Sequence, residues 1–144
     1  MNIYYNRNLI QFLKQYGLLA FIMLVLDSIY LKAVTPHFSQ LIKTVQGTPL
    51  QLKLIPAALC YVFLVFSLYY FVINQNGNQR EGVSIFTQTK NAFLLGLCIY
   101  MVYELTNMAI IKKWNYTTVL LDGVWGGILF ALTTFVYMKT HKWV

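Results

Sequence analysis

The sequence predicts an all-α polytopic membrane protein, a bundle of four transmembrane helices, and three observations support this prediction. Of the 144 residues, 58% are hydrophobic and only 10% are charged, whereas soluble domains carry roughly 25% charged residues. The apolar residues gather in four runs of about 20 residues, the length that a helix needs to cross a bilayer core of about 30 Å. The runs are continuous and lack the alternating polarity of β-barrel strands. We therefore expect one domain, residues 1–144, whose surplus apolar surface faces lipid.

The four runs place the expected helices at about residues 17–34, 54–73, 92–111 and 117–138. Inside lipid no water is present to hydrogen bond with the backbone, so each run must be helical. The first run contains Asp27 and ends without a small-residue cleavage pattern, so we interpret it as an uncleaved helix and not a signal peptide.

The connections between the runs differ in composition. Residues 35–53 include Pro36, Gly47 and Pro49, which predicts a loop with a short interfacial segment. Residues 74–80 are polar and turn-prone, and only about five residues separate the third and fourth runs. The last two helices are therefore expected to form a tight antiparallel hairpin.

The charge distribution indicates a lipid partner. The formal net charge is +7, and the cations flank apolar runs, where anionic headgroups are their expected partners. The sequence thus favours a lipid bilayer and excludes a nucleic-acid role. A small excess of lysine and arginine on the side of the two termini favours a cytoplasmic location for both.

Three of the four acidic residues, Asp27, Glu104 and Asp122, lie inside apolar runs. A charged side chain at the bilayer centre costs about 2.5–3.5 kcal/mol on insertion scales. At a rise of 1.5 Å per residue, all three acids lie about 8–10 Å from the same membrane face, because the fourth helix runs opposite to the third. The sequence therefore predicts one acidic layer inside the bundle.

Other polar side chains fall at the same depth and on the same helix faces as these acids. The candidate binding layer comprises Asp27, Tyr30, Tyr103, Glu104, Thr106, Asn107, Asp122 and Trp125. If the layer holds a metal ion, the three acids would supply its ligands, since hard cations prefer oxygen. The sequence leaves any cofactor unknown. A purely structural layer, with Asp27 paired to Lys32, is the alternative.

Small and aromatic residues give further expectations. Gly123, Gly126 and Gly127 allow close helix approach, either within the bundle or in a dimer. Cys60 and Cys98 are expected in different leaflets as apolar packing residues, too far apart for a disulfide. By composition, Trp114 belongs to an interfacial aromatic belt, and His37 and His141 lie in loops outside the spans.

Three short motifs carry a resemblance to a known family. They are Asp27-Ser28-Ile29-Tyr30-Leu31, Tyr103-Glu104-Leu105-Thr106-Asn107 and Asp122-Gly123-Val124-Trp125-Gly126. In this order they resemble the small membrane proteins called domain of unknown function 2177, whose patterns are Asp-x-x-Trp-Leu, Tyr-Asp-x-Thr-Asn and Asp-x-x-Trp-Gly. Tyr30 stands where that family usually has tryptophan, and Glu104 where it usually has aspartate. The resemblance covers nearly the whole chain and implies a four-helix fold with no established activity.

Three classes of function follow from the acidic layer. The first is transport or permeation linked to a proton or cation, for which a homo-oligomer would be needed because four helices barely enclose a path. The second is a non-catalytic membrane subunit or stabiliser whose acids are structural. The third is a membrane-embedded enzyme acting on a lipid or isoprenoid, for which the sequence identifies no nucleophile.

Overall fold

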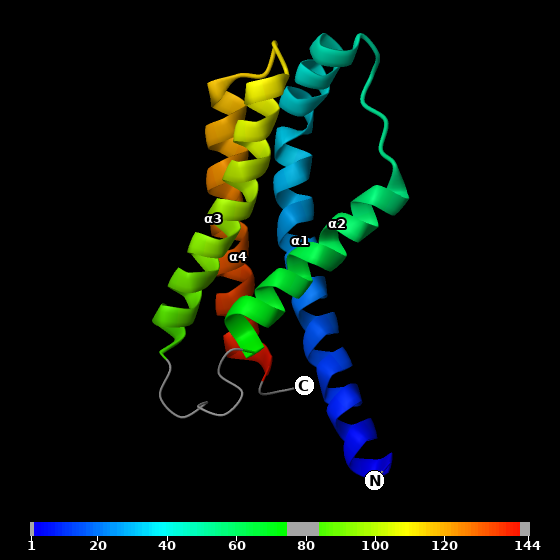
Figure 1. Ribbon diagram of the computed structural model, residues 1–144, viewed down its shortest axis with the longest axis vertical. Coiled ribbons are helices and arrows are strands. Elements are labelled where there is room, and N and C mark those ends of the chain that lie inside the picture. The colour runs from blue at the N-terminus through cyan, green and yellow to red at the C-terminus, as the bar shows by residue number, and fades with distance from the viewer. Residues whose placement is uncertain (1, 75–83, 142–144) are drawn as a thin grey trace.

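The computed structural model describes residues 2–74 and 84–141, with side chains from residue 8 onward. Its elements are α1 (Asn2–Gln46), α2 (Leu54–Leu68), a π-helical continuation η1 (Tyr69–Ile73), α3 (Ile85–Ile110) and α4 (Tyr116–Thr140). Four helices of this part of the chain, with α2 and η1 taken as one, are long and apolar enough to cross a membrane. The predicted fold class is confirmed, and Figure 1 shows the arrangement.

Helix α1 is much longer than the expected 17–34. It has 45 residues and therefore a length of about 68 Å, more than twice the hydrocarbon core, and its N-terminal end projects beyond the other helices (Figure 1). The predicted loop from residue 35 is wrong, because α1 continues through Pro36, and proline is tolerated in membrane helices where other groups satisfy the freed backbone. The helix ends at Gly47, which has a φ of 75° and donates its N–H to the Lys43 carbonyl at 2.9 Å, as a glycine helix stop does.

The other boundaries have local causes. Helix α3 begins at Ile85 and not near residue 92, because the Ser84 side chain accepts a hydrogen bond from the Thr87 N–H and caps it. Helix α4 begins at Tyr116, where the Asn115 side chain accepts from the Thr118 N–H. The connection between α3 and α4 is as short as the sequence predicts. Of the predicted polar loop 74–80, only Asn74 lies within the described residues.

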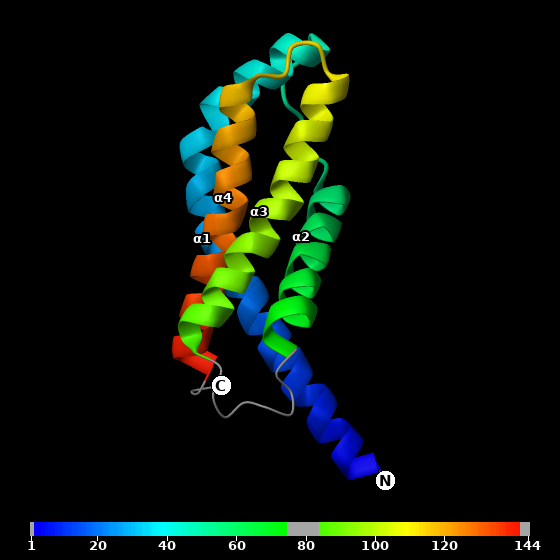
Figure 2. The ribbon, with the colours of Figure 1, turned by 60° about the vertical axis from the view of Figure 1, so that its left-hand side comes forward.

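Helices α3 and α4 form the most extensive pair, α1 packs on α4, and α2 crosses obliquely and contacts mainly α1 (Figures 1 and 2). The close approach of α3 and α4 depends on glycine. A Cβ on Gly126 would lie 2.2 Å from Tyr100 Cγ. Gly123 and Gly127 also lie close to side chains of α3, to Met101 and Phe93 respectively. This glycine face is therefore occupied within the chain and is not free for a dimer.

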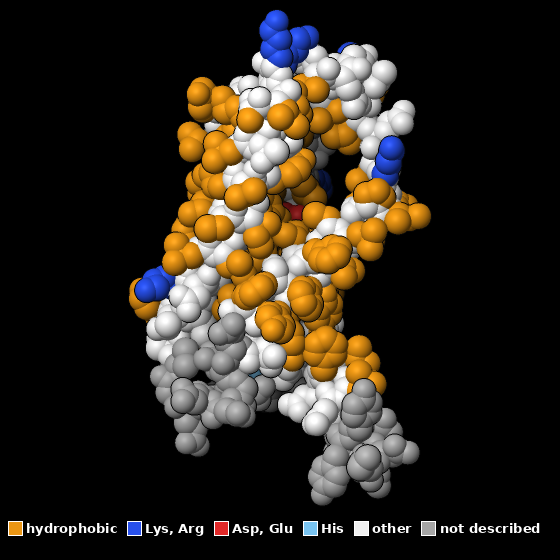
Figure 3. All heavy atoms as spheres, in the orientation of Figure 1, with side chains coloured by type: hydrophobic (Ala, Val, Ile, Leu, Met, Phe, Trp, Pro, Cys, Tyr) orange, Lys and Arg blue, Asp and Glu red, His pale blue; other side chains and the backbone are white. Residues whose placement is uncertain are grey.

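Two apolar clusters lie at opposite ends of the bundle. The larger contains Leu19 and Met23 of α1 with Leu129 and Phe130 of α4. The smaller contains Leu41, Trp114 and Val119. The outer surface is largely hydrophobic (Figure 3), as expected of helices that face lipid. Along α1 and α4, the predicted acidic layer falls between the two clusters.

Candidate functional site: an acidic layer with aromatic donors

Asp27 joins three helices. It lies on α1 and is 6% exposed. The Tyr61 hydroxyl from α2 donates a short hydrogen bond to Oδ2, and the Trp125 Nε1–H from α4 donates to Oδ1 at 2.8 Å. Both carboxyl oxygens of Asp27 therefore have donors, which offsets part of the cost of burying them.

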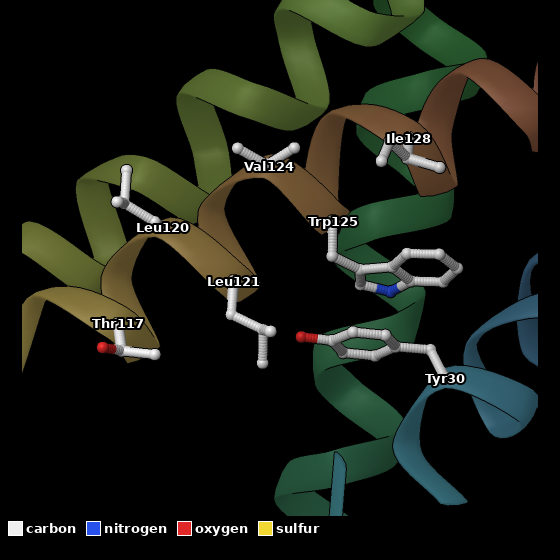
Figure 4. A pocket seen from close by; sticks show the side chains of 7 residues that line it. All are labelled: Tyr30, Thr117, Leu120, Leu121, Val124, Trp125 and Ile128. Atoms are coloured by element: carbon white, nitrogen blue, oxygen red, sulfur yellow. The ribbon is translucent and has the colours of Figure 1, made fainter. Parts of the chain in front are cut away.

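Tyr30 links this group to the second acid, Asp122. Its ring stacks on the Trp125 indole with centroids 4.3 Å apart and planes within 7°, as Figure 4 shows. Its hydroxyl donates to Asp122 Oδ1 at 3.1 Å. The outer side of this aromatic pair opens into a shallow apolar groove of about 580 Å³, lined by Thr117, Leu120, Leu121, Val124 and Ile128 of α4.

Glu104 is the most deeply buried acid, with no exposed surface. The Trp114 Nε1–H donates to Oε2 at 2.7 Å. The carboxyl groups of Glu104 and Asp122 lie against each other. Within the described part of the chain, no donor reaches the other oxygen, Oε1. Glu104 is therefore buried beside a second acid, and one of its carboxyl oxygens has no hydrogen-bond partner in the described part of the chain.

Five of the eight predicted layer residues come together: Asp27, Tyr30, Glu104, Asp122 and Trp125. The other three occupy different places.

Tyr103 is 59% exposed and only borders the layer. Asn107 is half-buried, and its backbone carbonyl accepts from the Ile111 N–H. Thr106 is exposed and donates to the Val102 carbonyl at 2.6 Å. Two residues along a helix amount to about 200° of rotation, so Thr106 points away from the face that carries Glu104.

The predicted binding layer leaves out two donors, Tyr61 and Trp114. Counting along the second span places Tyr61 at the depth of the acids, but the candidate binding set does not include it. Trp114, expected in the interfacial belt, is only 9% exposed. A usable signal existed, because each buried carboxylate needs a donor, and tyrosine and tryptophan can donate a hydrogen bond while their rings pack among apolar neighbours.

His37 lies in α1, not in a loop, and hydrogen bonds with Thr118 at 2.9 Å. Cys60 and Cys98 are free, but the prediction that they pack inside is wrong because both are exposed. Lys32 is exposed, and the oxygens of Asp27 are occupied by Tyr61 and Trp125 instead.

A cavity of about 340 Å³ reaches the layer from the opposite side to the groove. Its lining comes from α2, α3 and α4 and consists of Cys60, Leu64, Ile99, Tyr100, Tyr103 and Asp122. We call it the α2–α3 cavity. Figure 3 shows an acidic side chain at the bottom of the hollow beside α2.

The three acids do not form a metal site of the expected kind. Among the described residues, no group of three or more His, Cys, Asp or Glu side chains is arranged to hold a metal ion. The aromatic donors explain this, because they take both oxygens of Asp27, Oε2 of Glu104 and Oδ1 of Asp122.

Comparison with known proteins identifies the family. No curated protein and no solved structure matches the chain. A family model described as a predicted membrane protein, DUF2177, matches residues 12–138. This match covers all three acids and their aromatic donors. The chain is therefore an integral membrane protein that belongs to the DUF2177 family.

Proposed function

We propose that this protein is a proton-linked transport protein in which the Glu104–Asp122 pair takes up and releases the proton. The observation that carries the proposal is the Glu104 side chain, which is fully buried beside the Asp122 carboxyl group and whose Oε1 has no hydrogen-bond partner in the described region. Two ionised carboxylates in contact away from water repel each other strongly. A proton shared by the two carboxyl groups removes this repulsion, so the pair is suited to proton exchange.

Proton binding is better supported than metal binding. The three acids of the layer have six carboxyl oxygens. Four of them already accept hydrogen bonds from Tyr or Trp, namely both oxygens of Asp27, Oε2 of Glu104 and Oδ1 of Asp122. A hard cation such as Mg²⁺ or Ca²⁺ needs several free oxygen ligands at once. A proton needs only the oxygens that these donors leave open.

A structural role for part of the layer is the second candidate, and Asp27 favours it. Both of its oxygens are satisfied by donors from two other helices. A carboxylate whose two oxygens each accept from a different helix fixes the register of α1, α2 and α4, as a subunit or stabiliser would require. We therefore propose that Asp27 has a structural role, holding α1, α2 and α4 together, and that the Glu104–Asp122 pair exchanges the proton.

Proton flux into proteoliposomes tests the proposal. The purified chain is reconstituted with an internal pH-sensitive dye, the membrane potential is clamped, and a pH gradient is imposed. We expect flux above that of empty vesicles, reduced about tenfold or more in Glu104→Gln and in Asp122→Asn, because an amide cannot exchange the proton. The control Cys98→Ser changes an exposed residue of α3 and should retain full flux.

Two results would contradict the proposal. One is flux no greater than that of empty vesicles. The other is flux that both amide variants retain while circular dichroism shows them folded.

A further inference from the structure

The α2–α3 cavity has the size and shape of a small-molecule site. Its volume of about 340 Å³ falls within the range of roughly 300–1,000 Å³ that is typical of ligand pockets. It is open at one side, because α2 diverges from α3 towards its N-terminal end (Figure 1). Cys60 and Tyr103 on its rim are both exposed, so a ligand would enter from the lipid side.

The walls of the α2–α3 cavity combine apolar, aromatic and charged side chains. Leu64 and Ile99 are aliphatic, Tyr100 and Tyr103 are aromatic, and Asp122 is the only charged residue of the lining. Behind Asp122 lies Glu104, fully buried, whose Oε1 finds no donor in the described chain. The cavity thus combines largely apolar walls with one acid, Asp122, whose carboxyl group is next to that of the buried Glu104.

This combination selects one class of ligand. A neutral apolar molecule would cover the Asp122 carboxyl group without supplying a positive charge to balance it, which is costly, and an anion would be repelled by it. A strongly hydrated inorganic cation would find too few oxygen ligands to replace its water. An organic cation with an apolar body satisfies both parts, because its charge faces the acid and the tyrosine rings favour a cation over their faces.

We propose that the α2–α3 cavity binds a small lipophilic monocation, an amine or ammonium compound, with its nitrogen at Asp122 and its apolar body against Leu64 and Ile99. This inference rests on the proposed function, since the cation replaces the proton of the Glu104–Asp122 pair. One positive charge enters the pair and one proton leaves it, so the charge of the site is unchanged. The exchange would couple movement of the cation to movement of the proton.

Calorimetry on the full chain in nanodiscs of phosphatidylcholine tests the inference. The probe is benzyltrimethylammonium, and the control ligand is neopentylbenzene, its neutral isostere in which carbon replaces nitrogen. We expect the cation to bind more tightly than the isostere. We also expect Asp122→Asn to weaken cation binding by about tenfold or more, the effect of losing one charged partner.

The two cysteines supply a matched pair of variants that leaves both acids intact. Cys60→Phe places a bulky ring in the cavity, whereas Cys98→Phe makes the same change at an exposed position of α3 outside the lining. Both positions are exposed, so neither change disturbs the buried core. We expect Cys60→Phe to weaken binding about tenfold, by steric exclusion, and Cys98→Phe to leave it unchanged.

Three results would overturn the inference. They are no binding of the cation to the wild type, equal binding to the wild type and to both Asp122→Asn and Cys60→Phe, and equal affinity for the neutral isostere. The proton flux assay is read separately. If flux depends on Glu104 but the cation does not bind, the result supports the proposed function and refutes the cation site. If the cation binds through Asp122 but no flux occurs, the result refutes the proposed transport function and supports the cation site.

Discussion

At the scale of the residue, each acid of the layer has its own set of partners. Asp27 accepts from Tyr61 and Trp125, Glu104 accepts from Trp114, and Asp122 accepts from Tyr30. The aromatic rings are amphipathic, so they lie among apolar neighbours and still donate one hydrogen bond. The acids therefore differ in their partners: both oxygens of Asp27 accept hydrogen bonds, whereas Glu104 Oε1 has no partner among the described residues.

The Asp27→Asn variant tests the proposed structural role of Asp27. An amide offers one acceptor and one NH₂ donor, so one of the two aromatic donors would face a donor group. We expect a loss of about 1–3 kcal/mol in the free energy of unfolding, the usual effect of leaving a buried polar group unsatisfied. Thermal or denaturant unfolding in detergent measures it.

The control for this variant is Ser28→Ala, at the next position. Ser28 is exposed and donates only to the Leu24 carbonyl of its own helix, so its loss should change stability little. An Asp27→Asn protein as stable as wild type would show that the two donors do not need the carboxylate.

At this scale, the depth of a side chain in the membrane could be predicted from the sequence, but the direction in which it points could not. The rise per residue of a helix is constant, so counting gave one level for Asp27, Glu104 and Asp122. The Trp114 ring, in contrast, belongs to the short connection after α3, and only the folded chain directs it back to Glu104. Thr106 was placed in the layer by its depth, although helix rotation carries it to the lipid side.

At the scale of the element, helices α3 and α4 behave as one packed unit. A Cβ on Gly96 would lie 2.2 Å from the Gly126 carbonyl oxygen, a backbone atom that cannot move aside without separating the helices. The pair is therefore held by contact between main chains as well as between side chains.

The Gly96→Ala variant tests this packing. We expect it to destabilise the protein by about 1–3 kcal/mol or more, the range for overpacking in a core. The matched control is Gly17→Ala in α1, because a Cβ at Gly17 meets nothing within 4 Å. Since alanine is the better helix former by up to about 1 kcal/mol, this control should be neutral or stabilising. Equal melting temperatures for the two variants would refute the contact.

A second group of polar atoms on α3 and α4 leads to a different expectation. The side-chain oxygens of Gln88, Thr89, Thr133 and Thr134 are buried, and the described residues supply no partner for them. Valine has the shape of threonine without the hydroxyl. Thr134→Val should therefore stabilise the protein by on the order of 1 kcal/mol, because it removes an unsatisfied group, and a rise in melting temperature checks this.

A fall in that melting temperature would mean that Thr134 has a partner, such as a buried water. The control Thr106→Val removes a hydroxyl that already donates to its own helix, and it should not produce the same gain.

The existence of the helices could be predicted, but only some of their ends: the second span (Leu54–Ile73) and the start of α4 lie within a residue of the expected positions, whereas both ends of α1 and the start of α3 do not. The apolar runs identify four spans, since backbone groups in lipid must be satisfied within a helix. The ends depend on particular caps: Gly47 stops α1, and Ser84 starts α3. Pro36 was taken as a boundary because it breaks helices in water, whereas α1 continues through it.

At the scale of the whole molecule, the four spans determine how the ends of the chain are placed. The first turn of α1 and the last turn of α4 lie at the same end of the bundle (Figure 1). We predict that both termini face the same compartment, the cytoplasm by the charge bias, and that the Lys112–Lys113 turn faces the other side. Topology reporters fused to each terminus test this. Opposite locations for the two reporters would contradict the four-span topology.

The connections between helices divide the molecule in two. Helix α2 is attached to α1 through Tyr61 and through the Tyr16 hydroxyl, which donates to the Val62 carbonyl at 2.6 Å. The contacts of Tyr30, His37 and Trp125 join α1 to α4. Because α2 contacts mainly α1, these contacts also connect α2 to the closely packed α3–α4 pair. Weakening them would therefore loosen α1 and α2 together.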